Sequence, residues 1–188
     1  MRSLLPRRAV LALLVAGPAR AQPAPESESA WQALAGGGMA LFRHAIAPGG
    51  GDPPGMRLGD CSTQRNLSDE GRAQARRIGA AFRERGIAVG AVHASAWCRA
   101  LETAELAFPG QVQPEPAFDS FFGARQDAEA RTAAARRVLL GWDGPGAMFV
   151  ATHQVNITAL TGIFPASGEG VVLRRDGGAL VVVGRIRP

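Results

Sequence analysis

The sequence predicts an α/β domain with a mostly parallel central sheet. Three observations predict it: short apolar segments alternate with amphipathic ones, glycine or proline separates most of them, and 188 residues suffice for one domain with its own core. Strands that alternate with helices are typical of α/β proteins, because each helix connects two parallel strands.

The first part of the chain contains one clear strand and one clear helix. The run "MALF" over 39–42 predicts a buried strand, after a short helix in "SAWQALAGGG". Residues 45–66 form a long loop rich in glycine and proline, and a loop of that length inside a domain is typically functional. The clearest helix follows over 67–86, where Ser68 can cap the N-terminus and Gly86 can close the other end.

The rest of the chain continues the alternation and closes with a hairpin. The expected elements are a strand over 87–95, a helix over 97–108, an extended segment over 111–118, a helix over 127–142, a strand over 147–153, a helix over 154–162, and a hairpin over 170–186 that turns at 176–178.

The first 21 residues predict a cleaved signal peptide. They have a basic start, an apolar stretch over 9–16 and a small-residue cleavage site in "ARA". The apolar stretch is far shorter than the roughly 20 residues that span a bilayer. We therefore expect a periplasmic or secreted protein, exported by the general or the twin-arginine route, with a linker and short helix over 22–36 and the main domain over 37–188.

The charge of the chain argues against nucleic acid as a partner. The sequence pI is about 11.0, but residues 1–21 hold four of the 21 basic residues and none of the 16 acidic ones, so the remaining chain carries +1. Once the signal peptide is removed, the net charge no longer indicates a basic surface that would bind a polyanion. Every basic residue is arginine.

The two cysteines, Cys61 and Cys98, leave two alternatives open. An even number of cysteines in an exported protein favours a disulfide, whereas two buried free thiols are equally compatible with the sequence.

Four nitrogen-rich side chains are expected to gather at one edge of the sheet. Arg43 and His44 follow the first strand, His153 ends a later strand, and Arg99 follows the strand over 87–95. Ligands of parallel sheets bind beyond the carboxyl ends of the strands. Arginine forks bind phosphate oxygens, and a neutral imidazole is a nucleophile, so this set predicts phosphoryl transfer without a metal or cofactor.

The motifs that hold these residues resemble the histidine phosphatase superfamily, also called phosphoglycerate mutase-like. "LFRHA", "NLSDEGRAQA", "SAWCRALETA" and "THQVNITALTG" occur in the order of that family, from about residue 37 to 164. The chain is most similar to small secreted bacterial phosphatases, a branch that includes lipopolysaccharide core heptose phosphatase-like proteins. The resemblance implies a three-layer α/β/α fold.

The resemblance also implies a role for each residue of the set. His44 is the implied nucleophile that becomes phosphohistidine, Arg43 and Arg99 hold the phosphoryl oxygens, and His153 stabilises the charge of the transition state. The family often uses a carboxylic acid to protonate the leaving oxygen. We expect Asp119 in this role, with Glu115 and Glu102 as rivals.

The chain departs from the family after the nucleophile. Ala45 stands where glycine is common, and an asparagine that often follows is missing; Arg65 and Asn66 are candidates to supply the phosphate contacts from another position. The third histidine, His93, is expected to be a packed strand residue. A zinc site built from the three histidines is disfavoured, because the nearby arginines repel a cation.

Three functions remain open from the sequence. A phosphatase acting on a small phosphorylated substrate, for instance an envelope sugar phosphate, fits best. A binding protein for phosphate or sugar phosphate would keep the pocket without turnover. A phosphoglycerate mutase is disfavoured, because its substrate-binding insertions are missing and the signal peptide predicts export.

Overall fold

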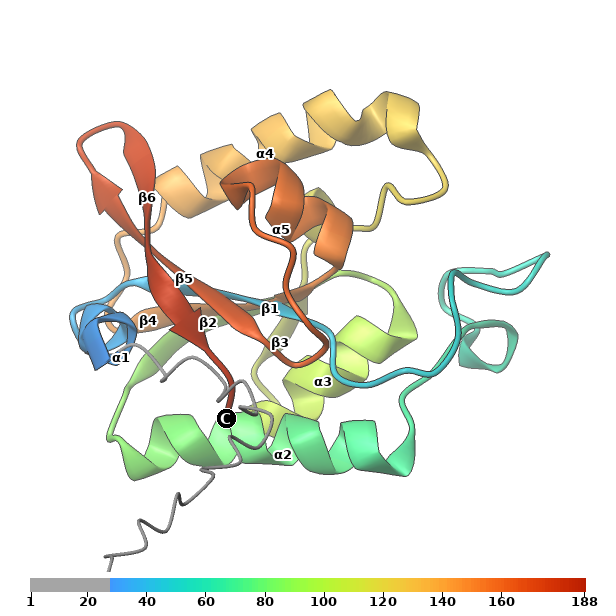
Figure 1. The fold of residues 1–188 in the computed structure, drawn as a ribbon, viewed down its shortest axis with the longest axis horizontal. Coiled ribbons are helices and arrows are strands. Elements are labelled where there is room, and N and C mark those ends of the chain that lie inside the picture. The colour runs from blue at the N-terminus through green and yellow to red at the C-terminus, as the bar shows by residue number, and fades with distance from the viewer. Residues whose placement is uncertain (1–27) are drawn as a thin grey trace, which may run out of the picture.

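A computed structural model describes residues 28–188 (Figure 1). The expected signal peptide over 1–21 and most of the expected linker lie outside the described residues. No helix of the described part is long and apolar enough to cross a membrane.

The centre of the molecule is a six-stranded sheet with the strand order β3-β2-β4-β1-β5-β6. The pairs β1–β4, β2–β4 and β2–β3 are parallel, whereas β5 runs antiparallel to both β1 and β6. The expectation of a mostly parallel sheet with a terminal hairpin is confirmed. The strands are β1 (Met39–Arg43), β2 (Val89–Ala94), β3 (Val112–Pro114), β4 (Ala147–Thr152), β5 (Gly170–Asp176) and β6 (Ala179–Ile186).

Helices cover both faces of the sheet and complete three layers, as Figure 1 shows with α2 and α3 below the sheet and α4 and α5 above it. The helix α1 packs with the α2 and α3 layer, because Trp31 stands edge-on to Phe82 of α2. The helices are α1 (Glu28–Ala35), α2 (Asp69–Glu84), α3 (Cys98–Ala107), α4 (Ala128–Leu140) and α5 (Gln154–Thr161), with short 3-10 turns at Cys61–Thr63, Pro116–Phe118 and Arg125–Asp127.

The helix α2 begins and packs as its sequence dictates. The Ser68 hydroxyl accepts a hydrogen bond from the Gly71 N–H at 3.1 Å, which satisfies one of the free donors of the first turn. A Cβ atom at Gly79 would lie 2.1 Å from the carbonyl oxygen of Ala107. Glycine at this position therefore lets α2 approach α3 closely.

The register between β1 and β4 positions the two histidines. Arg43 is paired with Thr152, so the residues that follow them, His44 and His153, leave the sheet side by side. The His44 N–H donates to the carbonyl oxygen of Thr152 at 2.9 Å and extends the pairing by one step. Because β4 lies between β1 and β2, the two histidines stand near the middle of the sheet and not beside one of its outer strands.

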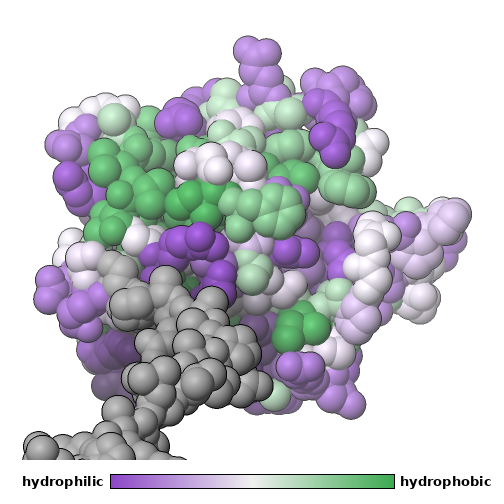
Figure 2. Space-filling view, in the orientation of Figure 1, coloured by the Kyte–Doolittle hydropathy of each residue, from purple (hydrophilic) through white to green (hydrophobic). Residues whose placement is uncertain are grey.

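The surface near the outer strand β6 is more apolar than that of the long loop. Figure 2 shows apolar residues gathered over the region of β6 and α5, while polar residues dominate the protruding loop at the right of the view. Val182 on β6 and Phe164 after α5 are among the exposed large apolar residues of the described chain.

Candidate active site

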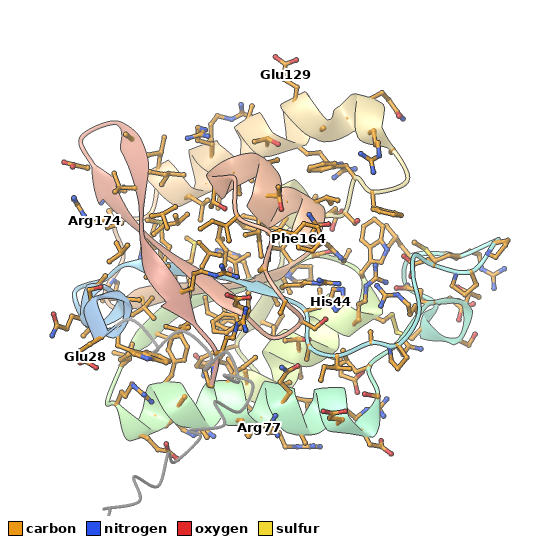
Figure 3. The ribbon with its side chains drawn as sticks, in the orientation of Figure 1. Glu28, His44, Arg77, Glu129, Phe164 and Arg174 are labelled. Atoms are coloured by element: carbon orange, nitrogen blue, oxygen red, sulfur yellow. A yellow bond between two sulfur atoms is a disulfide. The ribbon has the colours of Figure 1, made fainter. Side chains whose placement is uncertain are left out.

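His44 and His153 form a buried pair at the carboxyl end of the central strands. Their ring centroids are 5.5 Å apart and the rings stand edge to face. Only 3% of His44 and 4% of His153 is exposed to solvent. In Figure 3, His44 lies where β1 passes into the long loop. Two imidazoles from strands far apart in the chain therefore share one site.

The His44 ring is held in one tautomer. Its Nδ1 lies 2.8 Å from the carbonyl oxygen of Ala45, and since a carbonyl oxygen only accepts, Nδ1 must carry the hydrogen. Burial, and then the charges of three arginines, lower the pKa of His44 to about 3, although the bond to Ala45 opposes the shift. Nε2 is therefore unprotonated near neutral pH and keeps a lone pair for attack.

His153 is oriented by a serine. Its Nε2 lies 2.8 Å from the Ser95 hydroxyl oxygen, which itself accepts the Trp97 N–H at 3.3 Å. When the serine donates its own hydrogen to Nε2, the ring hydrogen of His153 lies on Nδ1. Burial and, after it, the charges of His44 and Arg99 lower the pKa of His153 well below its ordinary value. This imidazole is also neutral, so it can donate one hydrogen bond without repelling the nearby arginines.

Three arginines surround the histidine pair. One guanidinium nitrogen of Arg43 donates to the Pro165 carbonyl at 3.1 Å, and Arg65 donates to the Ala47 carbonyl. Arg99 is 3% exposed. The Nε atoms of Arg43, Arg65 and Arg99 are buried and have no hydrogen-bond partner in the described chain. These unsatisfied donors are suited to an anionic ligand, because buried polar groups are otherwise paired.

These side chains line one pocket of about 170 Å³. At about 30 Å³ per water molecule, that space holds roughly five or six waters, which is enough for a phosphoryl group and a few further atoms. The first residues of α5, Gln154 and Val155, also line it, so the positive end of that helix faces the pocket. The lining comprises Arg43, His44, Gly49, Gly50, Gly51, Asp52, Arg65, Arg99, Ser120, Phe122, His153, Gln154 and Val155.

The sequence prediction missed Asp52, the single carboxylate in this lining. Its two oxygens accept from the two terminal nitrogens of Arg99 at 2.6 and 3.0 Å, and one of them accepts from the Trp97 indole N–H at 3.0 Å. Burial raises the pKa of Asp52, but the hydrogen bonds and charge of Arg99 outweigh burial and hold it below its ordinary value. The sequence feature that could have indicated Asp52 is its position as a lone carboxylate in the glycine- and proline-rich segment "GGGDPPG".

Asp119 does not line the pocket. Its carboxylate accepts the Ala96 N–H at 2.8 Å, and its carbonyl oxygen accepts from the Asn156 amide at 2.9 Å. Arg131 lies 3.7 Å from the other carboxylate oxygen. These contacts dock the loop after the 3-10 turn at 116–118 onto the segment that follows β2 and onto α5, next to Ser120 of the lining.

The other predicted acids and Asn66 also lie elsewhere. Glu102 forms an ion pair with Arg72 at 2.6 Å, and Glu115 caps the 3-10 turn that follows it by accepting the Ala117 N–H. The Asn66 amide donates to the Cys61 carbonyl at 2.7 Å, outside the pocket. The structure thus brings Arg65 to the histidine pair and leaves its neighbour Asn66 away from it, since adjacent residues of an extended loop point in opposite directions.

Cys61 and Cys98 form a disulfide that connects the long loop to α3. Their Cα atoms are 5.7 Å apart, and Cys98 directly precedes Arg99. The Gln64 side-chain oxygen accepts a hydrogen bond from the Cys98 N–H at 3.0 Å and forms a second link between the long loop and α3. The disulfide therefore fixes the loop that carries Asp52 to the helix that carries Arg99.

The third histidine stays apart from the other two. His93 lies within β2, and its ring centroid is 6.4 Å from that of Phe118. It does not line the pocket. Within residues 28–188, no group of three histidine, cysteine or acidic side chains is placed to hold a metal ion.

Comparison with known proteins finds one family match, which covers less than half of the chain. The sequence pattern of the histidine phosphatase superfamily (branch 1) matches residues 55–142, a segment that includes Arg65 and Arg99 but neither histidine of the pair. The sequence matches none of the curated proteins.

Similar solved structures share the fold at low sequence identity. The protein histidine phosphatase SixA complexed with tungstate has a TM-score of 0.57 and 15% identity, covering 80% of this chain and 97% of its own. A putative alpha-ribazole-5'-P phosphatase from Escherichia coli has a TM-score of 0.58 and 18% identity, covering 80% and 98%. Phosphoglycerate mutase from Thermus thermophilus has a TM-score of 0.53 and 17% identity, covering 78% and 98%.

Proposed function

We propose that this chain is a phosphatase of the histidine phosphatase superfamily, which hydrolyses a phosphomonoester through a phosphohistidine on His44. One observation carries the proposal: two neutral imidazoles and three guanidinium groups surround a pocket of phosphoryl size. The superfamily match and the shared fold support it.

In the first step the Nε2 lone pair of His44 attacks phosphorus. The His44 ring is already oriented by its Nδ1–H bond to Ala45, so little reorganisation precedes the attack. Arg43, Arg65 and Arg99 stabilise the negative charge that spreads over the equatorial oxygens, and His153 donates one hydrogen bond to them. The alcohol then leaves from the opposite side of the phosphorus.

In the second step water attacks the phosphohistidine and releases inorganic phosphate. The same arginines stabilise this transition state, because its charge is spread in the same way. His44 returns to the neutral tautomer that Ala45 holds. Cationic side chains supply the charge stabilisation that a metal ion supplies in other phosphatases.

The solved neighbours support an oxyanion ligand. SixA is named a protein histidine phosphatase and holds tungstate, a tetrahedral oxyanion, in its structure. Another neighbour of the same fold is a phosphoserine phosphatase variant from Entamoeba histolytica in complex with phosphoserine. We propose a small phosphorylated substrate for this chain as well, with an envelope sugar phosphate as the first to test, because the signal peptide expected over residues 1–21 would direct the chain to the periplasm or beyond.

The test is to trap the intermediate and locate it. The protein is mixed with para-nitrophenyl phosphate, quenched within milliseconds and analysed by mass spectrometry under conditions that preserve phosphohistidine. We expect a phosphoryl group on His44 and its loss in His44→Ala, with turnover reduced at least about a thousandfold. The matched control is His93→Ala, which removes the histidine outside the pocket and should keep the activity. Turnover near the original rate in His44→Ala would refute the mechanism.

The alternative is a phosphate-binding protein without turnover. The position of Asp119 outside the pocket favours it, because a protein that only binds phosphate needs no acid to protonate a leaving group. Phosphate binding measured by calorimetry, together with no release of para-nitrophenol, would establish this alternative.

A further inference from the structure

Asp52 lies where two cavities meet. Besides the phosphoryl pocket it lines a neighbouring groove of about 560 Å³. Both cavities share Gly50, Gly51, Asp52, Ser120 and Phe122. The groove continues away from the histidines along Met56, Trp97, Gly123, Ala124 and Arg131.

The groove is suited to the alcohol part of a substrate. The pocket that holds the two histidines, at about 170 Å³, is much smaller than this groove, at about 560 Å³, so a large alcohol part of a phosphomonoester must extend into the groove. Phe122 is 54% exposed at the junction of the two cavities, and the Trp97 ring lies 5.4 Å from that of His153. The bond between phosphorus and the leaving oxygen would therefore lie at the junction, beside Asp52.

We propose that Asp52, rather than Asp119, exchanges the proton with the leaving oxygen, an inference that rests on the proposed phosphatase activity. Asp52 is the one carboxylate that lines either cavity within the described residues. Asp119 lines neither, and its carboxylate is held by the Ala96 N–H. Glu102 and Glu115 lie outside both cavities as well.

Substrate binding changes the charge around Asp52. Without a ligand the carboxylate is paired with Arg99 and is ionised. A phosphoryl group competes for the same guanidinium fork, since both are anions that accept two parallel hydrogen bonds. Once Arg99 turns to the phosphoryl oxygens, Asp52 loses its cation and gains an anionic neighbour, and both changes favour its protonated form. The substrate itself can bring the proton, because phosphate monoesters have a second pKa near about 6.

The proton balance closes over one turnover. In the first step the N–P bond to His44 forms, the P–O bond to the alcohol breaks, and the Asp52 carboxyl gives its proton to the leaving oxygen. In the second step a water oxygen bonds to phosphorus and gives its proton to the Asp52 carboxylate as the N–P bond breaks. The products are the alcohol and inorganic phosphate, and one water is consumed.

The experiment compares two leaving groups of similar shape. para-Nitrophenyl phosphate releases a phenolate that needs little protonation, whereas benzyl phosphate releases an alkoxide that needs an acid. Both carry one aromatic ring, so contacts with Phe122 stay similar. For Asp52→Asn we expect kcat/KM on benzyl phosphate to fall at least about 100-fold and that on para-nitrophenyl phosphate by less than about tenfold. Asp119→Asn should change both by the same factor.

The outcomes separate this inference from the proposed function. Equal losses on both substrates in Asp52→Asn would show that Asp52 only positions Arg99, and a selective loss in Asp119→Asn would assign the acid to Asp119; either result overturns the inference and leaves the phosphatase activity intact. No turnover of either substrate by the unmutated chain would refute the proposed function and the inference with it. Asp52→Glu, which keeps the carboxyl, should recover part of the benzyl phosphate activity and guards against a folding defect.

Discussion

The two sides of the phosphoryl pocket are built in different ways. On one side, Arg43 ends β1, and His44 and His153 directly follow β1 and β4, two neighbouring strands of the sheet. On the other side, Asp52 belongs to a loop whose one regular element between β1 and α2 is the short turn Cys61–Thr63. The strand side is held by backbone pairing, whereas the loop side is held by the ion pair with Arg99 and by the disulfide.

The difference assigns separate tasks to the two sides. Groups that must reach phosphorus within a fraction of an ångström are best placed on rigid elements, and groups that must yield to a substrate are best placed on loops. His44 has one tautomer and one orientation before any ligand arrives. Asp52 must exchange its partner Arg99 for substrate binding to proceed, and the glycines at 49–51 before it give the loop the freedom to do so.

The largest effect is expected on the strand side. Replacing His153 with Ala removes the hydrogen-bond donor that the proposed mechanism assigns to the phosphoryl oxygens, and such a loss typically lowers kcat by about 100- to 1,000-fold. Turnover of para-nitrophenyl phosphate measures it, and thermal unfolding checks the fold. A loss below about threefold would mean that His153 is not part of the reacting site and that the two sides of the pocket are not distinct.

The next effect is expected from removal of the disulfide on the loop side. The double variant Cys61→Ser with Cys98→Ser should lower the free energy of unfolding by about 2–4 kcal/mol, because the unfolded chain is no longer constrained. We expect KM to rise while kcat changes less, since the disulfide fixes the loop and not the histidines. Urea unfolding and steady-state kinetics measure the two quantities. A fall in kcat with unchanged KM would contradict the division between the two sides.

A smaller effect, on the pH dependence of the free energy of unfolding, is expected from the neutral His44. In the unfolded chain this histidine binds a proton near pH 6.5, whereas in the folded chain its pKa is about 3. Between these values the unfolded state binds more protons, so the free energy of unfolding falls as the pH falls, by about 2 kcal/mol from pH 7 to pH 5. His44→Asn should flatten this dependence in urea unfolding at the two pH values. An identical slope in both proteins would show that folding does not lower the pKa of His44.

The smallest effect is expected from Ser95, which lines neither cavity and contacts His153 and the Trp97 N–H. Ser95→Ala removes the hydroxyl at 2.8 Å from Nε2, and the loss of one neutral hydrogen bond typically costs about 1 kcal/mol. We expect a three- to tenfold fall in kcat, at about that free energy, and no selectivity between leaving groups. A selective loss on benzyl phosphate would assign Ser95 to proton transfer and contradict its role as a positioning residue.

The strands and helices could be predicted because local patterns determine them. The apolar run before Arg43 and the one before His153 predict buried strands, and parallel strands in α/β domains present their carboxyl ends at one edge. That rule was enough to expect His44, His153, Arg43 and Arg99 together, and the structure does bring them into one pocket.

The loop side could not be predicted in the same way. The path of a loop depends on long-range contacts such as those of Asp52 with Arg99 and Trp97, and no periodicity in the sequence encodes them. The family resemblance predicts Asp119 as the acid, but the chain turns its carboxylate toward the Ala96 N–H. Asn66 and Arg65 are adjacent in sequence, yet only Arg65 reaches the pocket.

The position of β4 in the sheet has a consequence for how the molecule acquires activity. This strand is made after β1, β2 and β3, yet it lies between β1 and β2. During folding the earlier strands must therefore leave room for it, a slow kind of long-range pairing. Until β4 pairs with β1, His44 lacks the neighbouring His153. The rate at which turnover recovers during refolding would therefore report when β4 joins the sheet.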